Sequence, residues 1–147
     1  MNTHRFDYLV IGSGAAGLLS ALRLSASGRV AVLTKRSPDI SNTDLAQGGI
    51  AAVTSPNDDF SLHIADTLRT GAGLSDEAVV EMTIKEAPER IKELVALGAR
   101  FSSSGGVFEL GLEGGHSRRR VLHAADATGH EIERALLASC RRHKNIQ

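Results

Sequence analysis

The sequence lacks what several classes of protein require. It holds one cysteine, Cys140, so no disulfide can form within the chain and no zinc or iron–sulfur site can be built from cysteines. Tryptophan is absent, aromatic residues make up 3% of the chain, and no apolar run approaches the length of a membrane span. The 17 basic and 17 acidic residues cancel, which leaves no field to attract nucleic acid or a membrane surface. We therefore expect a cytoplasmic protein with no nucleic-acid partner and a small-molecule ligand.

Glycine, in contrast, is abundant, with 15 residues in a chain of 147. Many of these glycines lie in predicted loops beside polar residues, as expected where backbone lines a ligand. The length is that of one ordinary domain, large enough to bury about two thirds of its unfolded surface.

The N-terminal region has the pattern of a nucleotide-binding βαβ unit. Tyr8–Ile11 predicts a buried parallel strand, because it is apolar throughout and ends at a glycine. Gly12, Gly14 and Gly17 then follow in G-x-G-x-x-G spacing, with a predicted helix from about Ala15 and a second strand afterwards. This order predicts a Rossmann-like α/β fold, with a parallel sheet flanked by helices and a pyrophosphate at the helix N-terminus. A glycine-rich turn without a ligand is the alternative.

The end of the second predicted strand, Val30–Leu33, bears on the choice of cofactor. A site for NAD places Asp or Glu near this point, about 20 residues beyond the last glycine. Here the strand leads into Thr34-Lys35-Arg36. A basic residue argues against NAD and suits either the extra phosphate of NADP or a flavin site that does not use the acid. A solvated lysine at a strand end is the third possibility.

A second glycine motif follows a loop predicted over residues 37–44. The adjacent Gly48 and Gly49 allow backbone to approach a flat or anionic ligand closely, and they equally suit a tight bend. Together with the first motif, Ser41-Asn42-Thr43 and Ala46-Gln47-Gly48-Gly49-Ile50-Ala51-Ala52 resemble the flavoprotein family of succinate dehydrogenase, fumarate reductase and L-aspartate oxidase.

This resemblance implies FAD as the cofactor. Members of the family that bind FAD covalently have a histidine after the serine of the second motif, and here that position holds Asn42. The resemblance therefore implies non-covalent FAD. The FAD-binding residues that it implies are Gly12, Ser13, Gly14, Ala15, Ala16, Gly17, Lys35, Asn42, Thr43, Ala46, Gln47, Gly48 and Gly49.

The middle of the chain predicts scaffold helices. An apolar stripe suits a helix over residues 61–69, in which His63 is most simply a surface or capping residue. Ser75 is predicted to cap the next helix. Pro88 should kink or restart that helix before its stop at Gly98.

The last helix is predicted to begin with a capping box, in which Thr128 and Glu131 satisfy free N–H groups at its start. The residues predicted for its inner stripe are Ile132, Ala135, Leu136 and Ser139, and Cys140 is predicted to be a packing residue. The apolar content of residues 145–147 indicates the beginning of another strand.

The chemically densest stretch is 113–120. It contains a carboxylate, two glycines, an imidazole, a hydroxyl and three arginines. Glu113 could pair with the cation of a small substrate, while His116 and an arginine could hold its anion. The alternative is a polar loop whose arginines face solvent.

The residues Glu113-Gly114-Gly115-His116-Ser117, followed by residues 123–129, are similar to the L-aspartate oxidase branch of the family. Dehydrogenase relatives typically have glutamine where His116 stands and lack the preceding glutamate. Leu112 departs from some members, which place an arginine there. The resemblance implies oxidation of L-aspartate to iminoaspartate, a step toward quinolinate and NAD. It also implies that Glu113 orients the substrate and that His116 and Ser117 help to hold it.

Family members are several times longer and carry a capping domain, a C-terminal helical domain and a proton-handling arginine. The resemblance therefore implies that residues 1–147 are the N-terminal part of an FAD-binding domain, inactive alone. The implied electron acceptors are oxygen or fumarate, and the implied protein partner is quinolinate synthase. The alternatives are another fumarate reductase or succinate dehydrogenase type of flavoprotein, an NADP-dependent reductase, and a non-catalytic nucleotide-binding module.

Overall fold

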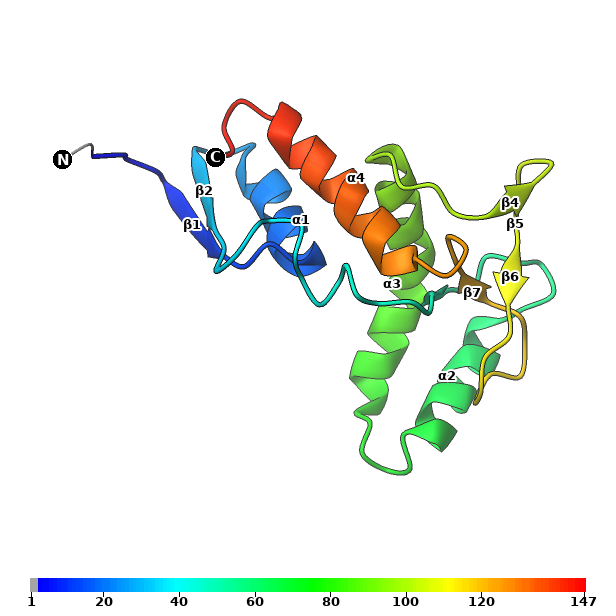
Figure 1. The fold of residues 1–147 in the computed structure, drawn as a ribbon. Helices are drawn as coiled ribbons and strands as arrows, with labels where there is room; N and C mark the ends of the chain where they lie inside the picture. The colour runs from blue at the N-terminus through cyan, green and yellow to red at the C-terminus, as the bar shows by residue number, and fades with distance from the viewer. Residues whose placement is uncertain (1–2) are drawn as a thin grey trace. The chain divides into compact units, whose positions relative to one another are not determined.

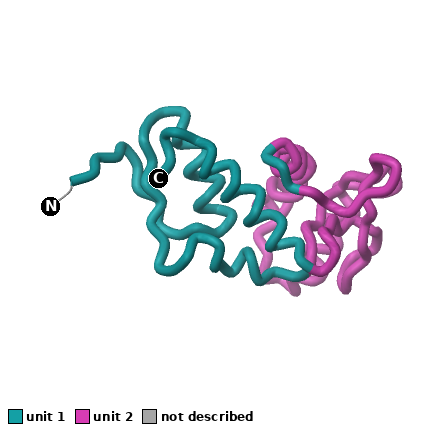
Figure 2. The backbone as a smooth tube through the Cα atoms, turned by 45° about the horizontal axis from the view of Figure 1, so that its top comes forward, with its two compact units in different colours: residues 1–47, 97–99, 127–147 teal, residues 48–96, 100–126 magenta. Residues whose placement is uncertain are grey.

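The structure is a computed structural model that describes residues 3–147, and these form two compact units (Figure 1, Figure 2). Unit 1 contains the residues up to 47 together with 97–99 and 127–147, and unit 2 contains 48–96 and 100–126. Within the described part of the chain, no helix is both long and apolar enough to cross a bilayer.

Unit 1 is a βαβ unit backed by the last helix. Strand β1 (Tyr8–Ile11) pairs in parallel with β2 (Val30–Leu33) along its whole length. Helix α1 (Ala15–Leu24) connects the two strands and packs against α4 (Thr128–Arg142). Ile146 bridges β2 in parallel, so the chain end begins another strand as predicted. This arrangement confirms the predicted α/β class with a parallel sheet and flanking helices (Figure 1).

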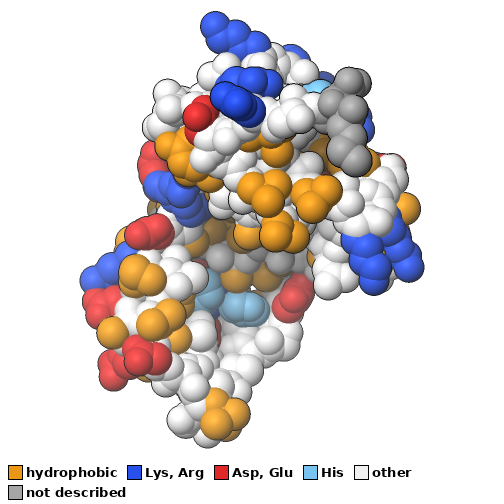
Figure 3. All heavy atoms as spheres, turned by 90° about the vertical axis from the view of Figure 1, so that its left-hand side faces the viewer, with side chains coloured by type: hydrophobic (Ala, Val, Ile, Leu, Met, Phe, Trp, Pro, Cys, Tyr) orange, Lys and Arg blue, Asp and Glu red, His pale blue; other side chains and the backbone are white. Residues whose placement is uncertain are grey.

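One face of this small sheet is exposed, so the prediction that β1 is a buried strand is wrong: its residues alternate between half-buried and exposed. Val10 faces α1 and lies near Gly17. Leu9, Ile11 and Leu33 expose 62%, 79% and 58% of their surface because alternate residues point to the opposite face. Figure 3 looks onto the side that carries β1 and β2 and shows hydrophobic side chains gathered there.

Unit 2 contains short antiparallel strands. A three-stranded sheet has the order β3 (Ile50–Ala51), β7 (Val121–Leu122), β6 (Leu110–Gly111). A separate antiparallel pair consists of β4 (Ser103–Ser104) and β5 (Val107–Phe108). Both residues of β7 are buried, which makes the central strand the core of the sheet.

Two helices of unit 2, α2 (Phe60–Thr70) and α3 (Glu77–Ala96), pack against each other. The prediction that Ser75 caps α3 is wrong. The side chain of Asp76 accepts a hydrogen bond from the backbone N–H of Val79 at 3.1 Å and is the cap. A carboxylate at this position also interacts favourably with the positive end of the helix dipole.

Helix α3 continues through Pro88 without interruption, so the predicted restart is wrong. Proline lacks the N–H that would bond to the carbonyl group of Ile84, which weakens the helix at one turn. Ile84 and Ile91 are buried on either side of the proline, at 5% and 2% exposure, and their packing holds the two turns in line. The helix ends before Gly98, whose φ of +101° favours glycine, as predicted.

Helix α4 begins without the predicted capping box. Its N-cap is Ala127, which has no side chain to cap the helix, and Thr128 is buried inside the first turn. The start of the helix is fixed instead by backbone contact. The N–H of Gly129 donates to the carbonyl oxygen of Ala46 at 2.9 Å, and a Cβ at Gly129 would lie 1.8 Å from the carbonyl oxygen of Thr43.

The inner stripe of α4 is buried as predicted and consists of Ile132, Ala135, Leu136 and Ser139, and Cys140 is buried as well. Burial raises the pKa of the Cys140 thiol to about 11. Its Sγ lies 3.5 Å from the carbonyl oxygen of Leu18 on α1. Cys140 is therefore a packing residue between the two helices.

Candidate functional site

The turn between β1 and α1 is as tight as its glycine spacing predicts. Gly12 has a φ of +106°, a conformation that favours glycine. A Cβ at Gly17 would lie 2.1 Å from the carbonyl oxygen of Gly12, so only glycine lets α1 approach the turn this closely. Ser13 is buried, and its hydroxyl donates to Oγ1 of Thr34 at 3.1 Å. The turn is thereby fixed to the end of β2.

The N-terminus of α1 has no acidic residue and no side-chain cap. Gly14 is the N-cap and offers no side-chain cap, and the first turn, which begins with Ala15, Ala16 and Gly17, contains no acidic residue. The N–H of Ala15 donates to Oγ1 of Thr43 at 3.1 Å. This N–H is therefore already paired in the structure, while the positive end of the helix dipole faces the turn, as it does in nucleotide sites that bind phosphate.

A cavity of about 490 Å³ opens at this point in unit 1. Its walls come from the β1–α1 turn, the end of β2 and the loop that follows β2, and consist of Gly12, Ser13, Gly14, Thr34, Lys35, Arg36, Ile40, Ser41, Asn42, Thr43 and Leu45. Six predicted FAD-binding residues therefore share one cavity, namely Gly12, Ser13, Gly14, Lys35, Asn42 and Thr43. Among the described residues that line it there is no carboxylate, and two side chains are basic. This lining suits a ligand with a pyrophosphate group.

The other predicted cofactor residues lie elsewhere. Ala46 and Gln47 end the first segment of unit 1, and Gly48 and Gly49 begin unit 2. A Cβ at Gly49 would lie 2.2 Å from the carbonyl oxygen of Leu122 in β7. The close packing of this backbone explains the glycine at position 49 without a ligand, so its role toward FAD stays a prediction.

The sequence analysis did not identify Glu133, which is 1% exposed on α4. Burial raises the pKa of this carboxyl group; the hydroxyl of Ser41 opposes the shift, and the charges of Asp44 and Asp39 reinforce it.

In unit 2, the predicted substrate residues lie on one turn. The N–H of His116 donates to the carbonyl oxygen of Glu113 at 3.2 Å, and Gly115 between them has a φ of +88°. Glu113 is exposed, and its Oε1 lies 3.7 Å from where a Cβ at Gly48 would be. His116 is half-buried and lines a cavity of about 320 Å³ beside α2. The turn thus presents a carboxylate, an imidazole and the hydroxyl of Ser117 over a short length of backbone.

Arg120 is fully buried and does not face a substrate. Its Nε and Nη2 donate to the two carboxylate oxygens of Asp58, both at 2.8 Å, and its Nη1 donates to Oδ2 of Asp66 at 2.8 Å. Nη1 also lies 3.3 Å from Nδ1 of His116. The interpretation of the three arginines as a solvated loop is therefore wrong for Arg120, which joins α2 and the preceding loop to the 113–117 turn.

Asp66 fixes Ser117. Its Oδ2 accepts from both the backbone N–H and the hydroxyl of Ser117 at 2.7 Å, and its Oδ1 accepts from Arg69 at 2.6 Å. Burial by itself would raise the pKa of Asp66, but the hydrogen bonds from Ser117, Arg120 and Arg69 outweigh it and hold the pKa below its usual range. Asp66 is therefore ionised at neutral pH.

His63 is buried at 5% exposure, so its prediction as a surface or capping residue is wrong. Its ring packs against that of His116, with centroids 5.5 Å apart. Burial and the nearby charge of Arg120 lower the pKa of His63, which favours the neutral form of the imidazole that packs against His116.

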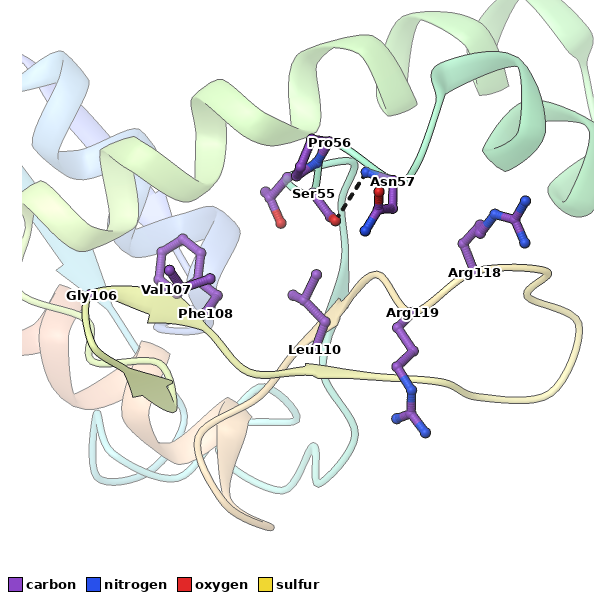
Figure 4. A pocket seen from close by; sticks show the side chains of 10 residues that line it. Ser55, Pro56, Asn57, Gly106, Val107, Phe108, Leu110, Arg118 and Arg119 are labelled. Atoms are coloured by element: carbon purple, nitrogen blue, oxygen red, sulfur yellow. Dashed lines mark hydrogen bonds between the residues drawn. The ribbon is translucent and has the colours of Figure 1, made fainter.

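Arg118 and Arg119 line a separate cavity of about 550 Å³. In Figure 4, Leu110 points toward Ser55 and Asn57, while Arg118 and Arg119 extend in different directions at the edge. The two guanidinium groups do not converge on one point, so they form no anion clamp here. The sequence predicted the polar loop at residues 113–120 but not its partners Asp58 and Asp66, which bind Arg120 and Ser117 from residues 58–66.

The βαβ unit, its glycine turn and the cavity beside it have the geometry of a dinucleotide-binding α/β protein. Comparisons with known proteins agree with this class. Over 146 residues the chain is 52% identical to the L-aspartate oxidase 2-a, chloroplastic, of Nicotiana tabacum, covering 99% of this chain and 23% of that protein. Over 143 residues it is 52% identical to the L-aspartate oxidase of Nostoc sp., covering 97% and 25%. A structure of E. coli quinol fumarate reductase FrdA superposes with a TM-score of 0.90 at 30% identity, over 100% of this chain and 26% of that one.

Residues 7–147 match the family described as FAD binding domain, and the chain belongs to that family. FAD is its cofactor, as predicted, which decides against the NADP alternative. The resemblance to the L-aspartate oxidase branch of the succinate dehydrogenase and fumarate reductase flavoproteins is likewise confirmed. The chain spans about a quarter of the length of the relatives that it matches.

Proposed function

We propose that this chain contributes FAD-binding residues and the substrate loop, residues 113–117, of an enzyme that oxidises L-aspartate to iminoaspartate. The observation that carries the proposal is the 113–117 turn, which presents Glu113, His116 and Ser117 together in a chain half identical to proteins named L-aspartate oxidase. A substrate with one ammonium and two carboxylate groups needs both an anionic partner and hydrogen-bond donors, and this turn supplies both.

Each group has a distinct role in the proposal. Glu113 pairs with the substrate ammonium, and His116 donates to a substrate carboxylate. The β1–α1 turn with Lys35, Asn42 and Thr43 holds the ADP half of FAD, and residues 46–49 contact the cofactor farther along. FAD, when bound, would supply the redox chemistry, namely acceptance of a hydride from the substrate α-carbon and transfer of the electrons to oxygen or fumarate.

We further propose that the active enzyme is a longer polypeptide. The relatives extend well beyond the matched region. Residues 1–147 would then be the N-terminal part of the FAD-binding domain, and a capping domain with a proton-handling arginine would complete the site. Because the chain contributes only one side of the proposed active site, we expect it to be inactive alone.

The proposed product feeds quinolinate synthesis and hence NAD, so quinolinate synthase is the proposed partner. Iminoaspartate hydrolyses readily, which favours direct transfer to the next enzyme. A single buried thiol suits a reducing compartment, and we propose a cytoplasmic location. Some plant relatives are named chloroplastic, and cell fractionation of the source organism distinguishes the two.

The test of the proposed activity is product formation by the full-length gene product. Incubated with FAD, L-aspartate and oxygen, it should release oxaloacetate and ammonia, because iminoaspartate hydrolyses to these products. D-aspartate serves as the matched control. Formation of fumarate from succinate at a higher rate than oxaloacetate from aspartate would assign the chain to a dehydrogenase instead.

We predict that FAD is held without a covalent bond. Asn42 stands where covalent members of the family have a histidine, and an amide side chain cannot form that bond. Acid precipitation of the FAD-loaded full-length protein should leave essentially all flavin in the supernatant. Flavin that stays with the precipitated polypeptide through washing would show that another residue forms the bond.

A further inference from the structure

The direction of one hydrogen bond is fixed at Ser117. Oδ2 of Asp66 lies 2.7 Å from the Ser117 hydroxyl, and a carboxylate with a lowered pKa can only accept. The hydroxyl proton therefore points to Asp66. Ser117 is an exposed residue, and its hydroxyl oxygen can offer a ligand only its remaining lone pairs, so it acts as an acceptor.

The direction of a second hydrogen bond is fixed at His116. Nη1 of Arg120 lies 3.3 Å from Nδ1 of the imidazole, and a guanidinium has donors but no acceptor. Nδ1 must therefore carry the lone pair. In the neutral ring the proton then lies on Nε2, which makes the other edge of His116 a donor.

We propose that the buried pair Asp66 and Arg120 sets the hydrogen-bond polarity of the substrate loop, with His116 as an N–H donor and Ser117 as an acceptor. This inference rests on the proposed function and deepens it. A donor suits a carboxylate, and an acceptor beside Glu113 suits an ammonium. The polarity would therefore select an amino dicarboxylate over a dicarboxylate without the amine, and Asp66 and Arg120 would be positioning residues for that choice.

The pair is well placed to hold this polarity. Arg120 is 0% exposed, and the side chains of Asp58 and Asp66 are 1% and 4% exposed, so water does not compete for their hydrogen bonds. Asp58 takes two donors of the guanidinium, which fixes its plane and leaves Nη1 aimed at Asp66 and His116. Neither acceptor nor donor can reverse its role, because one group has only lone pairs and the other only N–H bonds.

The activity test uses paired variants in the full-length gene product. Ser117→Ala removes the acceptor, whereas Ser117→Thr keeps a hydroxyl and is the matched control. Asp66→Ala releases the Ser117 proton, whereas Asp66→Asn keeps one oxygen that can accept from Ser117 and Arg120. For each variant, kcat/KM is measured for aspartate oxidation and for fumarate reduction by pre-reduced enzyme, with flavin content determined first.

We expect Ser117→Ala to lower kcat/KM for aspartate about tenfold to a hundredfold, the effect of one hydrogen bond to a charged group, and to change fumarate reduction by no more than about threefold. Asp66→Ala should lower the ratio of kcat/KM for aspartate to kcat/KM for fumarate as well. Combining Asp66→Ala with Ser117→Ala should lower this ratio little further, because Asp66 acts through Ser117. Ser117→Thr and Asp66→Asn should stay nearer to wild type. Equal losses on both substrates in Ser117→Ala overturn the inference.

A readout independent of activity is the tautomer of His116. In ¹⁵N-histidine-labelled protein above the titration range of histidine, the assigned His116 signals should show a protonated Nε2 and an unprotonated Nδ1. A protonated Nδ1 in the wild type overturns the inference. If the wild type oxidises aspartate but the Ser117 and Asp66 variants do not change the preference for aspartate over fumarate, the inference fails while the proposed function stands. If the wild type does not oxidise aspartate, the proposed function fails and the selectivity assignment fails with it.

Discussion

Replacing Glu113 by glutamine in the full-length gene product is expected to lower kcat/KM for L-aspartate by roughly thirtyfold to several thousandfold. This range corresponds to about 2–5 kcal/mol, the usual effect of truncating one partner of a desolvated charge pair. Glu113 is exposed in the structure, so the full effect requires that bound substrate and cofactor exclude water from it. Glutamine keeps the size of the side chain and removes only the charge.

Fumarate gives the internal comparison, because it has no ammonium group. Its reduction by the pre-reduced Glu113→Gln enzyme should fall far less, or improve, since a carboxylate would no longer face a dianion. Glu109→Gln is the matched control variant, because Glu109 is another exposed glutamate just before β6. Losses of equal size for aspartate and fumarate would show that Glu113 supports the loop and does not recognise the amine.

Replacing Gly14 by valine is expected to abolish retention of FAD. A Cβ at this position would already lie 3.3 Å from Oγ1 of Thr43, and the branches of valine would extend into the cavity where the pyrophosphate meets α1. Loss of two hydrogen bonds to a charged phosphate corresponds to at least about a hundredfold in affinity. Gly14→Ala, with one added carbon, should give an intermediate loss.

The measurement is the flavin content of purified protein, followed by titration of the apoprotein with FAD. Circular dichroism of each variant shows whether the fold is kept, because Gly14 is the N-cap of α1 and its replacement could disturb the start of the helix. Wild-type flavin content in Gly14→Val would contradict the assignment of this turn to the pyrophosphate.

The βαβ unit could be predicted from the sequence because its signals are local. An apolar run, three glycines at fixed spacing and a second apolar run lie within residues 8–33, and the structure has both strands and the helix there. The exposed face of β1 could not be predicted, because an apolar strand gives no sign of whether both faces of its sheet are covered.

The composition of residues 113–117 indicated a candidate substrate-binding loop, but it did not indicate the hydrogen-bond network beneath that loop. Arg120 is 62 positions from Asp58 and 54 from Asp66, so no local pattern joins them. One signal was present: Asp66 lies among the apolar residues of its helix, and a charged residue at such a position is usually paired. The predicted caps at Ser75 and Thr128 failed because neighbouring backbone and side chains competed for the same helix ends.

The most direct measurement is anaerobic mixing of the FAD-loaded full-length gene product with L-aspartate while the visible flavin band is recorded. If the chain carries the FAD-binding residues and the amine-selective loop of an aspartate-oxidising flavoenzyme, aspartate should bleach the band and succinate at the same concentration should do so far more slowly. Bleaching by succinate at the same rate as by aspartate, or no bleaching by aspartate, would contradict this function.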